Sequence, residues 1–184
     1  MRLLFFAVPT CRTLQWFRLP LAPPPAPADD TFARFAATLE AAGLRAALAY
    51  LLGLTDHRFI AIFRFQGGKA NAAVYVDRDN PEVLGVDEVP ASATYRCYAL
   101  DARGVFSRAD AMSDPRLNDH VAREFVKSYC GVPVMTPEGE ILGTLCHYDL
   151  VPRNPDQVDL MLILQVASLL GRSRLVPPYP HAPA

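Results

Sequence analysis

The stretch "SYCGVPVMTPEGEILGTLCHYDLVPRNPD", residues Ser128–Asp156, decides the prediction of the fold. Two apolar runs, Tyr129–Thr136 and Glu140–Leu150, flank the turn sequence "PEGE". Apolar runs with β-branched and aromatic residues predict strands, and a short glycine-containing connection predicts an antiparallel hairpin. Gly139 supplies the backbone angles of the turn, and Gly143 lets its strand approach a neighbour closely. The segment therefore predicts two paired strands.

A strong helix signal follows this hairpin. Asn154 can cap a helix, Pro155 suits the first helical position, and Gln157 completes an asparagine variant of the capping box. The helix is predicted to end at Gly171, because a left-handed residue closes helices at low cost. Its apolar residues occupy more than one face, so we expect one face to pack on the sheet and a second on another helix or subunit.

The first half of the chain predicts a helix and a second hairpin. Apolar side chains recur about every 3.6 residues from Phe32 through Ala42 and Ala49, which indicates an amphipathic helix that ends near Leu52. Strands over residues 58–65 and 70–79 follow, and the consecutive glycines of "QGGK" between them suit a tight hairpin turn.

The segment between the two hairpins combines turn and helix signals. Residues 81–95 predict a loop, and residues 116–129 predict a helix with Leu117, Val121 and Phe125 on one face. Together these elements predict an α+β fold: one antiparallel sheet with the terminal helices on one face and the loop and helix of the middle segment crossing the other. The second face of such a sheet is free to enclose a cavity.

Prolines indicate the domain boundaries. Ten of the seventeen lie within residues 1–28 or 175–184, and proline-rich runs continue neither a helix nor a sheet ladder. We therefore predict a Pro-rich flexible extension over residues 1–28, one domain over 29–176 and a Pro-rich tail over 177–184.

The overall composition is that of a soluble globular protein, with 51% hydrophobic and 20% charged residues. A formal net charge of -1 provides no basic surface for nucleic acid. No uninterrupted apolar run approaches the ~20 residues of a membrane helix. Four cysteines without a CxxC pair or disulfide-framework spacing indicate reduced thiols. We therefore expect a cytoplasmic protein that binds neither nucleic acid nor a membrane.

The stretch "DAMSDPRLNDH", Asp110–His120, and the final hairpin together resemble the signature of GAF domains, small-molecule-sensing modules that share an architecture with PAS domains. The resemblance spans about Thr31 to Leu170 and implies a GAF/PAS-like fold. The matching positions are Asp110, Ala111, Asp114, Pro115, Arg116, Tyr129, Gly131, Pro133, Gly139, Gly143, Thr144, Leu145, Cys146, Asp149, Pro152 and Arg153.

The resemblance also implies a ligand site between the sheet and the segment that crosses it, about residues 83–125. Val132 and Val134 would form the floor. The wall would comprise Tyr95, Cys97, Phe106, Ser107, Asp110, Ala111, Leu117 and Val121. We expect no resident metal or cofactor, because the histidines have no second imidazole or acidic partner at metal-ligand spacing.

The cysteines leave chemical alternatives. Cys146 and His147 resemble the Cys-His pair to which some phytochrome-type GAF domains attach a bilin, but adjacent strand residues point to opposite faces. Cys146 also matches a position that is commonly cysteine in GAF domains without a chromophore, so we expect a core cysteine. Cys97 and Cys130 leave an enzymatic alternative, because one branch of GAF domains resembles free methionine-R-sulfoxide reductases. Such chemistry needs two thiols within bonding distance, one of them with a lowered pKa.

The expected function is that of a sensor rather than an enzyme. It would bind an unidentified small molecule non-covalently and signal as a homodimer or through a partner protein. The sulfoxide reductase is one alternative. The other is a ligand-free dimerisation scaffold whose cavity is filled by Tyr95, Tyr98 and Phe106.

Overall fold

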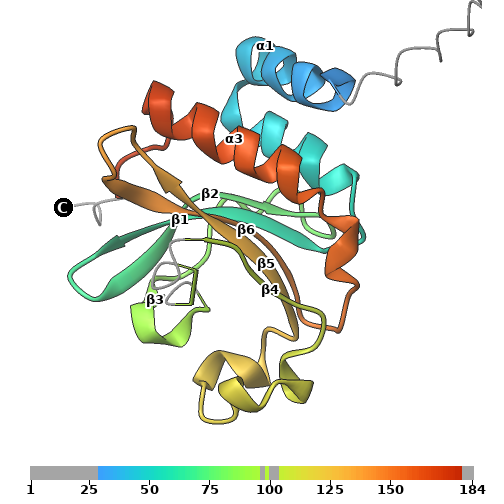
Figure 1. Ribbon diagram of the computed structural model, residues 1–184, viewed down its shortest axis with the longest axis vertical. Helices are drawn as coiled ribbons and strands as arrows, with labels where there is room; N and C mark the ends of the chain where they lie inside the picture. Colours follow the sequence, from blue (N-terminus) through green and yellow to red (C-terminus); the bar gives the residue numbers. More distant parts are fainter. Residues whose placement is uncertain (1–28, 96–97, 100–103, 180–184) are drawn as a thin grey trace, which may run out of the picture.

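The computed structural model describes residues 29–95, 98–99 and 104–179, and its centre is one antiparallel sheet. Helices α1 (Asp29–Gly53) and α3 (Leu160–Ser173) cover one face, and the segment between the hairpins lies on the other side (Figure 1). The predicted α+β architecture is confirmed. The strands run in the order β3 (Val89–Pro90), β2 (Lys69–Asp77), β1 (Phe59–Gln66), β6 (Ile141–Asp149), β5 (Ser128–Met135) and β4 (Phe106–Arg108).

The helix-facing side of the sheet is aliphatic and forms the main core. Side chains from β1, β5 and β6 meet the buried faces of both helices there, because strand residues two apart point to the same side. Burial of these side chains supplies most of the favourable free energy of folding. The main contributors are Ile60, Ile62, Val132, Val134 and Leu145 from the strands, Leu48 and Leu51 from α1, and Val166 and Leu170 from α3.

Helix α1 is broken at Gly43, whose φ of 83° and ψ of 174° are not helical. The break changes the phase of the apolar stripe. Phe35 is buried before it and Leu48 after it, whereas Ala42 and Ala49 are exposed. The prediction of one continuous stripe was therefore wrong from Ala42 onward, since the break at Gly43 rotates the second half of the helix.

By length and apolar composition, Asp30–Gly53 could cross a membrane, and it is the one such helix in the described part of the chain. Its second half packs on the sheet, where Ala47, Leu48, Leu51 and Leu52 are at most 3% exposed. Core helices of globular domains have the same composition.

Helix α3 begins and ends later than the sequence predicts. Asn154 caps the 3-10 turn η5 (Pro155–Gln157) instead, and the Asp159 carboxylate caps α3 by accepting from the Leu162 backbone N–H at 3.0 Å. Arg174, not Gly171, is the left-handed residue that ends the helix. Gly171 lies where α3 crosses β5, and a Cβ there would be 1.9 Å from the carbonyl oxygen of Met135.

The predicted helix over residues 116–129 was wrong. The structure has the 3-10 turns η3 (Pro115–Leu117) and η4 (Val121–Glu124), and β5 then begins at Ser128. Asp114 accepts from the Arg116 N–H at 3.0 Å, and His120 Nδ1 accepts from the Ala122 N–H at 3.1 Å. Side chains that bond the backbone two residues ahead favour separate turns over a continuous helix.

We predict that Gly171→Ala destabilises the domain by about 1–3 kcal/mol, because α3 must move away from the Met135 carbonyl to make room for a methyl group. Chemical denaturation measures this loss in the free energy of unfolding. Gly53→Ala is the matched control: nothing lies within 4 Å of its Cβ position. That variant should be neutral or more stable by up to about 1 kcal/mol. Equal effects of the two substitutions would contradict the close contact of α3 with β5.

Candidate ligand-binding pocket

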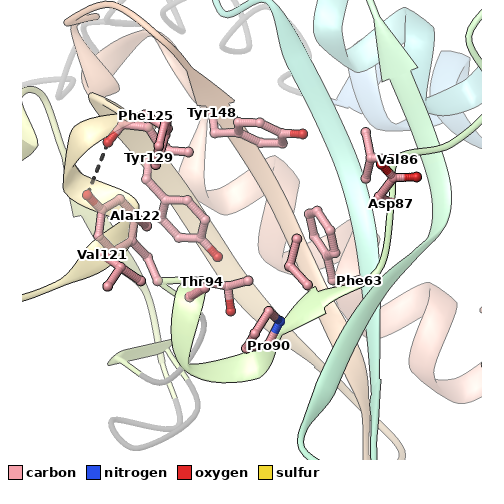
Figure 2. Close-up of a pocket in the computed structure, with 14 residues that line it drawn as sticks. Phe63, Val86, Asp87, Pro90, Thr94, Val121, Ala122, Phe125, Tyr129 and Tyr148 are labelled. Atoms are coloured by element: carbon pink, nitrogen blue, oxygen red, sulfur yellow. Dashed lines mark hydrogen bonds between the residues drawn. The ribbon is translucent and has the colours of Figure 1, made fainter.

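A cavity of about 500 Å³ lies on the side of the sheet opposite α1 and α3, between the sheet and the crossing segment. Figure 2 shows side chains from β1, β5, β6 and the crossing segment converging on it. The volume is in the range of small-molecule sites. The lining residues are Phe63, Val86, Asp87, Val89, Pro90, Ala93, Thr94, Tyr95, Val121, Ala122, Phe125, Val126, Tyr129 and Tyr148.

The floor of the pocket consists of aromatic side chains from neighbouring strands. Tyr129 of β5 pairs with Tyr148 of β6, and Tyr148 pairs with Phe59 of β1, so the three side chains share one face. The rings of Tyr148 and Phe59 stack with centroids 4.8 Å apart, and the Phe63 ring lies 6.4 Å from Tyr148. Ring pairs at such distances make favourable contacts beyond their buried area, which holds the floor in place.

Gly131 leaves the space that Tyr129 occupies. A Cβ at this glycine would lie 2.4 Å from the Tyr129 hydroxyl, so the phenol ring lies over Gly131 along the sheet. Any larger residue would displace the ring from its position at the floor.

The wall of the pocket is formed by residues 86–95 and by η4. Thr94 donates its hydroxyl to the Ala91 carbonyl at 2.8 Å, closing the 3-10 turn η1 (Ala91–Ala93). The Tyr95 hydroxyl donates to the Val126 carbonyl at 3.0 Å, the hydrogen bond drawn in Figure 2. This bond joins two parts of the wall that are 31 residues apart in the sequence.

The rim of the pocket is apolar and exposed. The side chain of Phe125 is 73% exposed and that of Val121 is 60% exposed, although both line the cavity. Exposed apolar groups beside a concave apolar surface are typical of binding sites, because an occupant removes them from water.

The phenols of the pocket are uncharged at neutral pH. Burial raises the pKa of Tyr95 to about 12. Burial likewise raises the pKa of Tyr129 and that of Tyr148 well above the ordinary value. The tyrosines therefore supply ring faces and neutral hydroxyls.

Of the ten predicted ligand-binding residues, Tyr95 and Val121 line the cavity. Phe106, Ala111 and Leu117 are buried in the cluster of side chains beside it. Asp110 caps the 3-10 turn η2 (Ala111–Ser113) by accepting from the Met112 N–H at 2.9 Å. Cys97 lies outside the described residues.

Val132, Val134 and Ser107 point to the wrong side of the sheet for the predicted site. Both valines belong to the core under the helices, and Ser107 pairs with Cys130, which belongs to the same core. The prediction selected the wrong set of alternating residues along the strand, because adjacent strand residues point to opposite faces of the sheet. Tyr129, on the other face of β5, is a floor residue that the sequence interpretation missed. The aromatic side chain on that face was the sequence signal that could have identified Tyr129 as a floor residue.

The described thiols are unsuited to chemistry. Cys146 is 1% exposed and is not among the lining residues, and burial raises its pKa to about 12. Burial also raises the pKa of the Cys130 thiol. Cys130 lies in the core under the helices and Cys146 in the cluster beside the pocket, so the sheet separates them. Cys146 is buried as the prediction of a core cysteine requires.

A smaller cavity of about 240 Å³ lies between α1 and the start of α3 and includes His147 in its lining. The rings of His147 and His57 have centroids 5.9 Å apart, and both side chains are fully buried. Within residues 29–95, 98–99 and 104–179, no three His, Cys, Asp or Glu side chains gather as a metal site would require. This cavity is smaller than the aromatic pocket and has a more polar lining, so the aromatic pocket is the better candidate ligand site of the two.

The chain matches the profile of the GAF domain family over residues 28–173. A 75-residue segment is 37% identical to a cyclic di-GMP phosphodiesterase of Pseudomonas aeruginosa, and it covers 39% of this chain and 13% of that protein. The chain therefore spans a small part of that relative.

Solved structures share the fold at low sequence identity. A far-red absorbing protein with bound biliverdin has a TM-score of 0.61 at 13% identity, over 77% of this chain and 95% of that one. A type II free methionine-R-sulfoxide reductase from Thermoplasma acidophilum has a TM-score of 0.53 at 17% identity, over 80% of this chain and 95% of that one. These similarities concern the fold alone.

We predict that the buried His147 makes stability fall on acidification. Burial and the neighbouring His57 lower its pKa from 6.5 to about 3. Below pH 6.5 the unfolded chain gains a proton that the folded state does not accept until about pH 3. Within that window the free energy of unfolding should lose about 1.4 kcal/mol per pH unit through this residue.

Denaturation at a series of pH values tests this dependence. His147→Gln should reduce the slope by about one proton. Ile163→Ala, a control in the same core layer, should lower stability equally at every pH and keep the slope. An unchanged slope in His147→Gln would show that His147 does not titrate in this way.

Proposed function

Because this chain belongs to the GAF family of sensor and signalling domains, we propose that it binds a small molecule non-covalently in the aromatic pocket. The bound state is passed on through the helices at the ends of the domain. The observation that carries the proposal is an open cavity of about 500 Å³ with apolar and aromatic walls. Burial of a ligand on such walls supplies the affinity.

The packing around the cavity favours a sensor over a filled scaffold. The Tyr98 and Phe106 rings stack on each other at 4.7 Å, and Tyr95 packs against Phe106 at 6.0 Å. These three rings occupy the space beside the cavity, and the cavity remains next to them. A scaffold without a ligand would gain stability by closing such a space.

The two described thiols favour reversible binding over covalent attachment or catalysis. Nucleophilic chemistry needs an accessible thiol with a lowered pKa, and the pKa values of Cys130 and Cys146 are both raised by burial. Formation of a disulfide would also require the two sulfur atoms to meet, and they lie on opposite faces of the sheet. Cys130 and Cys146, the thiols that the structure describes, therefore do not support the reductase alternative.

The route to an output passes through a homodimer formed by α3. Met161, Leu160 and Leu164 on the outer side of this helix are 68%, 40% and 39% exposed. An apolar groove beside them is lined by Phe32 of α1 and by Met161, Leu164, Gln165, Ser168 and Arg172. A second copy is the occupant we propose, since a two-fold axis beside α3 would bury these exposed apolar side chains against the same residues of the partner. The proposed location is the cytoplasm, and a signalling partner would receive the output from this dimer.

Native mass spectrometry of the protein purified from its own host tests ligand binding. We expect a mass above that of the chain under native conditions and the bare chain mass after denaturation. Ala93 lines the pocket, so Ala93→Trp should fill it and abolish the extra mass. Ser92 is exposed in the same turn and does not line the pocket. The Ser92→Trp variant should therefore retain the extra mass.

The bare chain mass under both conditions would contradict the sensor proposal. An adduct that survives denaturation would contradict non-covalent binding. An adduct present equally in wild type and Ala93→Trp would assign the ligand to another site.

Sedimentation equilibrium at micromolar concentration tests the dimer. We expect a mass near twice the 20.2 kDa of the chain. The double change Met161→Glu and Leu164→Glu should yield the 20.2 kDa monomer, because two carboxylates in an apolar interface lose their hydration. Leu150→Glu, at a residue 46% exposed and outside α3, should remain dimeric. A monomeric wild-type chain would exclude this route to an output.

A further inference from the structure

Among the described residues, none that lines the pocket is a positively charged partner for an anion. Fourteen described residues line it, and none is lysine, arginine or histidine. Asp87 at the rim is the one carboxylate among them. A phosphate or carboxylate placed in such a site would lose its hydration without gaining an ion pair.

Two described cations adjacent in sequence to the wall residues Ala122 and Val126 are engaged elsewhere. Arg123 donates to the backbone carbonyl oxygens of Ala111 and Met112. Lys127 donates from Nζ to the Arg123 carbonyl at 3.0 Å. These bonds hold the crossing segment together, so releasing either side chain toward a ligand would break the wall that it supports.

Two hydroxyl groups of the pocket wall are also engaged. Tyr95 donates to the Val126 carbonyl at 3.0 Å. Thr94 donates its hydroxyl to the Ala91 carbonyl at 2.8 Å. Tyr95 therefore contributes its ring face to the cavity, while its hydroxyl is bonded within the wall.

Resting on the proposed function, we infer that the ligand is a flat, apolar aromatic molecule that carries no negative charge. Its ring system lies against Phe63 and Tyr148, where offset or edge contacts between rings are favourable. Its outer part covers the exposed side chains of Phe125 and Val121. The carboxylate of Asp87 at the rim further disfavours an anion.

A pair of fluorescent probes separates charge from shape. N-phenyl-1-naphthylamine and 8-anilinonaphthalene-1-sulfonate share one ring skeleton and differ by a sulfonate group. Fluorescence titration of the full chain should give a dissociation constant about tenfold or more lower for the neutral probe. Ala93→Trp should abolish this binding, and Ser92→Trp should preserve it.

A gain-of-function variant tests the cause of the preference. Val121 is 60% exposed at the rim, so Val121→Lys should be tolerated and supply the missing cation. We expect it to tighten binding of the sulfonated probe by about tenfold relative to the neutral probe. An unchanged ratio of the two affinities in this variant would show that charge does not determine the preference and would overturn the inference.

The remaining outcomes distinguish this inference from the function on which it rests. If both probes bind the wild-type pocket equally and both lose binding in Ala93→Trp, the pocket binds ligands and the inference on charge is wrong. If neither probe shows binding that depends on residue 93, the pocket is closed to ligands and the proposed function fails with the inference.

Discussion

The alternation of side chains along β1, β5 and β6 is the constraint on which the rest of the structure depends. Because successive residues of a strand point to opposite sides, each strand presents two chemically different surfaces. The helix-facing surface is aliphatic, with Ile60, Ile62, Val132, Val134 and Leu145. The opposite surface combines rings with small residues, with Phe59, Ala61, Phe63, Tyr129, Gly131, Cys146 and Tyr148. One surface builds the core and the other leaves room for a cavity.

Close backbone contacts tie these surfaces to their neighbours. A Cβ at Gly143 would lie 2.3 Å from the carbonyl oxygen of Phe63, and one at Gly171 would lie 1.9 Å from that of Met135. The C-terminal end of strand β5 therefore contacts α3, and the N-terminal end of the same strand carries Tyr129, which lines the pocket. Under the proposed function, a ligand acts on α3 through this strand only if it binds one arrangement of the strand and helix more tightly than another.

The choice of pocket residues illustrates where inference from the sequence stopped. Val132 and Val134 are apolar and were expected to form the pocket floor. Apolar character alone does not show which face of the sheet a residue of β5 lies on. The aliphatic face meets the apolar helices and the aromatic face meets the crossing segment. Sorting residues 129–134 by ring content would have assigned Tyr129 to the pocket. The wall residues Val86–Thr94 lacked any periodic signal.

The sequence by itself determined the two hairpins, the terminal helices and the resemblance to GAF domains. These follow from local periodicity and from turn glycines such as Gly68 and Gly139, which both have positive φ angles. Only the tertiary structure decided the face of β5 that lines the pocket, and whether local signals such as Gly43 and the capping side chain of Asp114 produce a break and 3-10 turns. The face of β5 depends on which distant segments meet each side of the sheet. The crossing segment is held on its side by contacts such as the bond from Tyr95 to Val126, and local patterns contain no information about such pairs.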